Sequence, residues 1–194
     1  MYVELHARSA FSFLEGSSLP EDLAGACARF NMPAMALLDT DGVYGAPRFH
    51  QAAKKLGIKA YIGAEVTCAV SQSTIKNQQS AIAPVRIGNP FRLPLLVSSR
   101  AGYRNLCRLI TKMKLRAKKG EGAVHKEELE EHAGGLICLT GGTDGPLAIA
   151  LQHGGIEEAR KQVEPSFVTH SPPSAITAHS RPPDVCWHAT PSVI

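Results

Sequence analysis

The sequence of 194 residues predicts an α/β fold. Short apolar runs of strand length alternate with segments in which apolar residues have helical spacing. Gly, Pro, Asn and Asp residues separate these segments and mark turns. Strands that alternate with helices are typical of a parallel sheet or a barrel. The expected strands are residues 2–6, 33–38, 60–63, 93–98 and 136–140.

The first strand is predicted by its two-residue alternation, which separates an apolar face from a polar one. The apolar face carries Val3, Leu5 and Ala7, and the polar face carries Glu4, His6 and Arg8. His6, Asp39 and Glu65 each stand at the close of an apolar run. Because α/β folds gather their chemistry at strand ends, we expect these three side chains at one rim of the sheet.

Two helices are predicted between the first three strands. Ser18 and Glu21 have the spacing of a capping box, and Pro20 falls inside the first turn. Leu23, Cys27 and Phe30 then follow at helical spacing. A second helix begins near Pro47 and carries Phe49, Ala53 and Leu56. Gly57 is expected to end it in the left-handed conformation.

Residues 100–119 predict an amphipathic helix. Its apolar stripe consists of Tyr103, Leu106, Cys107, Ile110 and Met113. A basic row recurs every four residues, at Arg100, Arg104, Arg108, Lys112 and Arg116. The segment contains eight basic residues and no acidic one, whereas the rest of the chain contains 13 basic and 17 acidic residues. The positive charge is therefore local.

The basic row has two explanations that the residues leave open. A solvated helix face is the usual reason for such a run, and a stripe that faces nucleic-acid phosphates is the alternative. The acidic residues at 127–131 follow at once and could neutralise the row within the chain.

Composition limits the class of protein. The hydrophobic content of 44% is enough for the core of one domain. Five scattered Cys residues without a CxxC pair indicate reduced thiols of a cytosolic protein rather than a disulfide or zinc framework. Neither a signal peptide nor a membrane span is apparent. We therefore expect a cytoplasmic protein with no membrane partner.

Two segments lack the strand or helix pattern. Residues 70–89 are rich in Gln, Ser and Ala and predict an exposed loop. Residues 165–194 form an irregular tail rich in Pro, Ser and His, for which a frameshifted or truncated reading frame is the simplest account. The expected organisation is one domain portion over residues 1–164, followed by this tail.

Five motifs in order resemble the N-terminal PHP (polymerase and histidinol phosphatase) domain of bacterial C-family polymerases, the DNA polymerase III alpha subunits. The error-prone branch of that family is the closest match. The motifs are HARSAFSFLEG at 6–16, ALLDTDGVYGA at 36–46, IGAEV at 62–66, GYRNLCRLI at 102–110 and GLICLTG at 135–141. The resemblance implies the N-terminal part of a distorted (β/α)7 barrel that is truncated.

The resemblance places His6, Asp39 and Glu65 at metal-ligand positions of PHP domains. Arg8 and Thr40 stand where the family's metal binders have His. Arginine stays protonated in proteins, so Arg8 opposes a cation and could replace it by pairing with Asp39 or Glu65. We therefore predict a degenerate, metal-free site, lined by Arg8 and Thr40.

The function implied is that of a PHP module with a structural role in an error-prone DNA polymerase, which would perform template-directed and translesion DNA synthesis. Its partners would be DNA, the other polymerase domains and replisome or translesion accessory proteins. The parent's nucleotidyl transfer would use Mg²⁺, whereas no cofactor and no catalytic activity are expected of the fragment alone. The alternatives are a PHP phosphoesterase, the one case that requires Zn²⁺ or Mn²⁺, and a non-catalytic nucleic-acid-binding module.

Overall fold

The computed structural model describes residues 2–69, 90–118 and 120–163. The predicted loop at 70–89 and the predicted tail at 165–194 lie outside the described residues. In chain order the elements are β1 (Glu4–Ala7), α1 (Pro20–Arg29), β2 (Ala34–Thr40), α2 (Ala46–Lys55), β3 (Lys59–Cys68), β4 (Phe91–Val97), α3 (Arg100–Arg116), α4 (Lys126–His132), β5 (Leu136–Cys138) and α5 (Pro146–Val163). α5 is broken at Gly155, whose φ is 66°.

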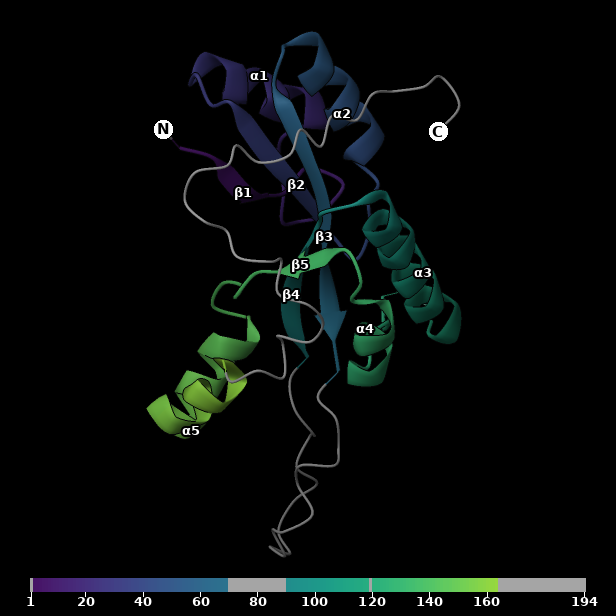
Figure 1. Cartoon of the computed structure of the whole chain (residues 1–194), viewed down its shortest axis with the longest axis vertical. Coiled ribbons are helices and arrows are strands. Elements are labelled where there is room, and N and C mark those ends of the chain that lie inside the picture. Colours follow the sequence, from purple (N-terminus) through teal and green to yellow (C-terminus); the bar gives the residue numbers. More distant parts are fainter. Residues whose placement is uncertain (1, 70–89, 119, 164–194) are drawn as a thin grey trace, which may run out of the picture.

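The five strands form one sheet in the order β1-β2-β3-β4-β5 (Figure 1). β1, β2 and β3 are parallel, whereas β4 is antiparallel to both β3 and β5. The α/β class is confirmed, but the expectation of a parallel sheet is wrong for β4. Parallel neighbours need a crossover, and α1 and α2 supply it for the first three strands. The described sheet is open and mixed, which is consistent with part of the expected barrel.

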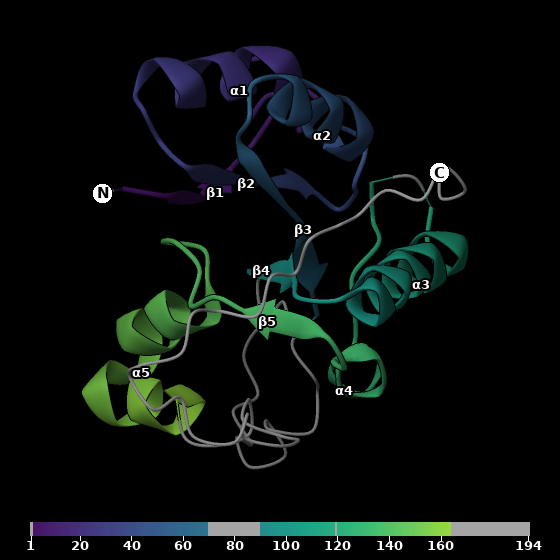
Figure 2. The ribbon, with the colours of Figure 1, turned by 45° about the horizontal axis from the view of Figure 1, so that its top comes forward.

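One core lies between the first three strands and the helices α1 and α2. Met35 and Leu37 of β2 point into it and pack with Cys27 of α1 and Phe49 of α2. Figure 2 shows α1 and α2 together over this part of the sheet. The alternating residues Ala36 and Leu38 are buried on the opposite face, in a small cluster with Leu96 of β4. A strand buried on both faces explains why β2 is apolar almost throughout.

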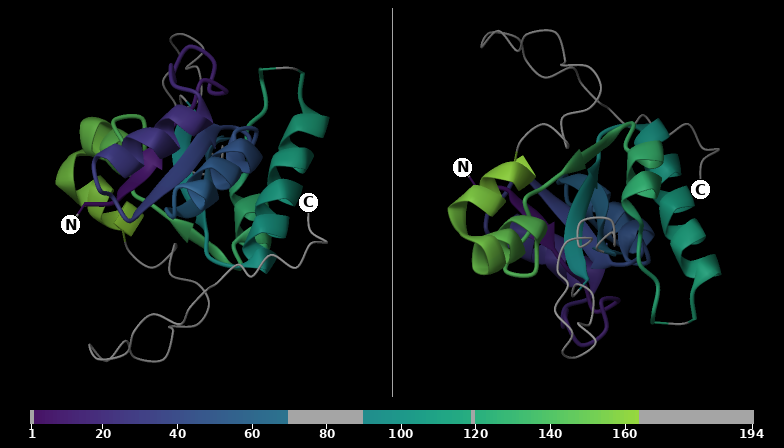
Figure 3. Two further views of the ribbon diagram at one scale, coloured as in Figure 1. Left: turned by 90° about the horizontal axis from the view of Figure 1, so that it is seen from above. Right: turned by 90° about the horizontal axis from the view of Figure 1, so that it is seen from below.

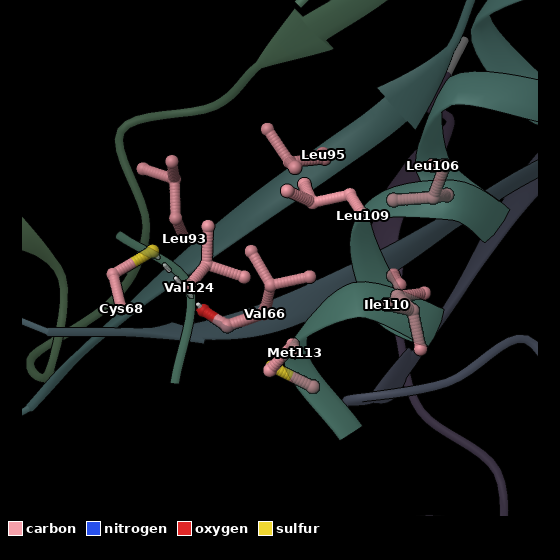
Figure 4. Packing of buried hydrophobic residues seen from close by; sticks show 10 residues of the cluster. Val66, Cys68, Leu93, Leu95, Leu106, Leu109, Ile110, Met113 and Val124 are labelled. Carbon is pink, nitrogen blue, oxygen red and sulfur yellow. Dashed lines mark hydrogen bonds between the residues drawn. The ribbon is translucent and has the colours of Figure 1, made fainter. Parts of the chain in front are cut away.

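A second core joins α3 to β3 and β4 (Figure 4). The helix buries Leu106, Leu109, Ile110 and Met113 against the strands. The predicted apolar stripe lacks Leu109, and the structure corrects this because Leu109 is fully buried. Tyr103 and Cys107, two members of the predicted stripe, are only partly buried. The buried face therefore centres on Leu106 and on Leu109 and Ile110, which lie three and four residues after it, and is rotated slightly from the expected face.

The structure tests two predicted helix boundaries, the stop at Gly57 and the capping box at Ser18. Gly57 has φ of 70° directly after α2, as expected for a left-handed stop. The capping box at Ser18 is wrong, because Pro20 is the first helical residue and Leu19 is the N-cap, without a side-chain hydrogen bond. The Ser18 carbonyl accepts instead from the Ala10 amide at 2.8 Å. Ser18 therefore fastens the loop before the helix.

Candidate functional site

Glu65 lies inside β3, which continues beyond it to Cys68. It stands in register with Thr40 of β2 and Pro94 of β4, and its side chain is fully buried. The expectation that Glu65 closes its strand is therefore wrong. Pairing with β4 extends the strand, so the carboxylate lies on the face of the sheet rather than at its rim.

Three side chains surround the Glu65 carboxylate. His6 Nε2 lies 2.8 Å from Oε1, and the Arg8 guanidinium pairs with Oε2. Arg92 Nη1 lies 3.7 Å from the same Oε2. Burial raises the pKa of Glu65, but the hydrogen bond to His6 and the charge of Arg8 outweigh burial, so the pKa is lowered overall. The surroundings thus favour an ionised carboxylate.

The two arginines also share a second carboxylate, that of Glu15. Its Oε2 accepts from Arg92 Nη1 at 2.5 Å and from Arg8 Nη1 at 3.1 Å. The Thr40 hydroxyl donates to the same oxygen at 2.8 Å. The hydrogen bond from Arg92 lowers the pKa of Glu15 more than burial raises it. Arg8, Glu15, Glu65 and Arg92 form one arginine–carboxylate cluster.

Asp39 belongs to a separate hydrogen-bond network. Its Oδ1 accepts from the Ser9 amide and hydroxyl, both at 2.8 Å, and from the Ser12 hydroxyl at 3.0 Å. Its Oδ2 accepts from the Gly45 amide at 3.1 Å. Successive strand residues point to opposite faces, so Asp39 and Thr40 diverge. The buried Asp39 therefore fastens two loops and does not meet Glu65.

These residues do not fit the metal centre that the family resemblance implies. Divalent cations need several oxygen or nitrogen ligands that converge on one point. No group of three or more His, Cys, Asp or Glu residues in the described parts of the chain has that arrangement. Arg8 contributes a fixed positive charge beside Glu65, and the Thr40 hydroxyl is engaged by Glu15. A guanidinium thus pairs with Glu65, one of the residues that the resemblance places at a metal-ligand position.

The structure brings His6, Arg8 and Glu65 into direct contact, and Thr40 joins them through Glu15, whereas Asp39 lies apart. Of the two partners considered for Arg8, Glu65 is the one it pairs with. Two members of the cluster, Glu15 and Arg92, were missed by the sequence reasoning. Arg92 gave a usable signal, because a charged residue inside the apolar run of β4 needs a buried or shared partner.

The predicted basic row on α3 is divided by its surroundings. Arg116 pairs with Glu128 of α4, and Lys112 Nζ lies 3.0 Å from Glu131 Oε2. The hydrogen bond with Arg116 is the main cause that lowers the pKa of Glu128 to about 2. Neutralisation by the acidic stretch is therefore confirmed for this half of the row. Arg100, Arg104 and Arg108 are exposed and form no ion pair with any residue that the structure describes.

The family model of the PHP domain matches residues 4–171. The chain belongs to the PHP domain family. Its matched region covers the arginine–carboxylate cluster and both halves of the basic row. No helix among the described residues is long and apolar enough to cross a membrane.

Curated relatives place this PHP domain with the N-terminal region of bacterial polymerases. The error-prone DNA polymerase of Anaeromyxobacter sp. (strain K) is 39% identical over 164 residues, covering 78% of this chain and 13% of the relative. The error-prone DNA polymerase of Mycobacterium tuberculosis (strain ATCC 25618 / H37Rv) is 36% identical over 191 residues, and the match covers 94% of this chain and 16% of the relative. The DNA polymerase III subunit alpha of Buchnera aphidicola is 35% identical over 155 residues, and the match covers 79% of this chain and 12% of the relative. The matches thus cover only 12–16% of the length of these relatives.

Among solved structures, an amidohydrolase from Chromobacterium violaceum with bound sulfate and no metal is similar. It has a TM-score of 0.43 and 18% identity, and the match covers 89% of this chain and 56% of that one.

Proposed function

We propose that this chain is a non-catalytic PHP module with a structural role in an error-prone DNA polymerase. The observation that carries the proposal is the Arg8 guanidinium paired with the buried Glu65, where the family's metal binders have His. The names of the curated relatives support the polymerase context. In that context the parent protein performs template-directed and translesion DNA synthesis, with DNA and the other polymerase domains as partners.

Electrostatics supports a structural role for the cluster. A divalent cation placed about 4 Å from the Arg8 guanidinium would be repelled by that group by about 8 kcal/mol at an effective dielectric constant of about 20, which offsets the attraction of one carboxylate at the same distance. Arg8 cannot lose its proton to relieve that repulsion. The guanidinium instead joins β1 to β3, and Arg92 joins β4 to the loop that carries Glu15. The cluster therefore links β1, β3 and β4 through ion pairs of this chain's own side chains.

Metal content tests the proposal. The purified full chain is incubated with Mn²⁺ and Zn²⁺, desalted and analysed for metal, and its hydrolysis of bis-p-nitrophenyl phosphate is measured. We expect well below one metal per chain and no hydrolysis above buffer. Wild-type protein that retains one or more metals per chain and hydrolyses the ester would overturn the proposal in favour of a PHP phosphoesterase.

A pair of variants makes the measurement specific to the cluster. Arg8→His removes the fixed charge and supplies an imidazole beside His6 and Glu65, so it should retain more metal than the wild type. Arg29→His adds the same imidazole at an exposed position at the end of α1 and should leave the metal content unchanged. Equal metal content in both variants would show that Arg8 does not govern the site.

A further inference from the structure

Three arginines on α3 remain available for a partner. Arg100, Arg104 and Arg108 are exposed, and no described carboxylate pairs with them. We call these three residues the arginine row. The neighbouring cations of the same helix, Lys112 and Arg116, are engaged by α4. The structure thus separates a free half of the basic face from a neutralised half.

The arginine row is unfavourable for the helix by itself. Like charges four residues apart lie next to each other on a helix and repel. Arg100 is the first helical residue, and the first turn contains no acidic residue. A cation there also opposes the positive end of the helix dipole. Departures from local rules that lack a compensating contact are typical of functional positions.

The opposite face of α3 fixes the row in space. Leu106, Leu109 and Met113 are buried against β3 and β4, so the helix cannot turn its arginines away (Figure 4). Figure 3 shows α3 on one flank of the molecule, with α5 on the other. Residues four apart rise about 6 Å along a helix, so the row spans about 12 Å. That length matches three to four phosphates of one DNA strand, at about 3.4 Å per phosphate along the axis.

We infer that Arg100, Arg104 and Arg108 form a contact row for the phosphate backbone of nucleic acid. The row consists of arginines, whose planar guanidinium binds phosphate oxygens in a bidentate manner, whereas Lys114 of the same helix lies over the Tyr44 ring. The contact is independent of sequence, because phosphates carry no base information. This inference rests on the proposed function and assigns to this PHP module its own surface for DNA.

DNA binding by the full chain tests the row. Fluorescence anisotropy with a labelled 20-base-pair duplex is measured in a series of NaCl concentrations. Arg104→Gln/Arg108→Gln should make the salt slope shallower by about 1.8, that is about 0.9 for each lost phosphate contact. If the plots of affinity against NaCl concentration for the wild type and the variant meet near 1 M, the variant binds about 200-fold more weakly at 50 mM NaCl. With a single-stranded probe, the salt slope should become shallower by about 0.7 for each lost phosphate contact.

The matched control removes the same charge elsewhere. Lys54→Gln/Lys55→Gln changes two exposed cations at the end of α2 and should leave the slope unchanged. Equal losses in both double variants, or no binding of DNA by the wild type at 50 mM NaCl, would overturn the inference. Binding of polyglutamate in place of DNA would overturn it in favour of an acidic protein partner. The metal analysis of the same preparation tests the proposed function separately.

Discussion

Replacing Arg8 by Met removes the guanidinium that faces the buried Glu65. Glu65 is fully buried, whereas the Arg8 side chain is 25% exposed. Removing one partner of a buried ion pair costs roughly 3–5 kcal/mol, and an exposed pair contributes about 0–1. Arg92, at 3.7 Å, can take over part of the charge compensation. We therefore expect a loss of about 2–3 kcal/mol at pH 7.

Thermal unfolding of the full chain measures this loss. For a chain of this size, about 1 kcal/mol shifts Tm by roughly 2–4 °C, so Arg8→Met should unfold about 4–12 °C below the wild type. Arg48→Met is the control, because Arg48 pairs with Glu21 while both side chains are more than 40% exposed. Its Tm should fall by about 4 °C at most.

The dependence on pH follows from the lowered pKa of Glu65. A carboxyl whose pKa is lower in the folded state stabilises the fold above its unfolded pKa and loses that contribution as the pH falls through its folded pKa. Without Arg8, burial is no longer outweighed to the same extent, so the pKa of Glu65 rises. The difference in Tm between the wild type and Arg8→Met should be largest near pH 7 and shrink below about pH 4. A difference under about 2 °C at pH 7, or one that stays constant with pH, would refute the reasoning.

Two further perturbations have expected outcomes. Glu128→Gln keeps a residue suited to the capping box of α4 but removes the ion pair with Arg116. Because the pKa of Glu128 is lowered to about 2, urea unfolding should show a loss of about 1–2 kcal/mol above pH 4.5 that disappears toward pH 2, and an equal loss at both pH values would contradict it. Leu14→Gly should stabilise the chain by about 0.5–1 kcal/mol in the same assay, because the 89% exposed Leu14 has φ of 63°. A lower unfolding midpoint would show that Leu14 makes stabilising contacts that outweigh its backbone strain.

Local patterns in the sequence were sufficient for most elements. Alternation in residues 2–8 placed His6 and Arg8 on one face of β1, and both side chains meet Glu65. Gly57 ends α2 through a left-handed conformation, which glycine adopts without a side-chain clash. The five motifs carried the family membership, which the match over residues 4–171 shows. The metal-free state and the DNA contact remain predictions.

The sequence by itself determined the α/β class, the family and the sign and position of the local charges, because these depend on neighbours within a few residues. The tertiary structure decided which charges meet. Glu15 and Arg92 are 77 residues apart, and no periodicity relates them. The choice of Glu65 over Asp39 as the partner of Arg8 follows from the alternation of β2 and its register with β3. The division of the basic face likewise depends on where α4 packs, because its carboxylates pair with Lys112 and Arg116 and not with the three arginines before them, among the residues that the structure describes.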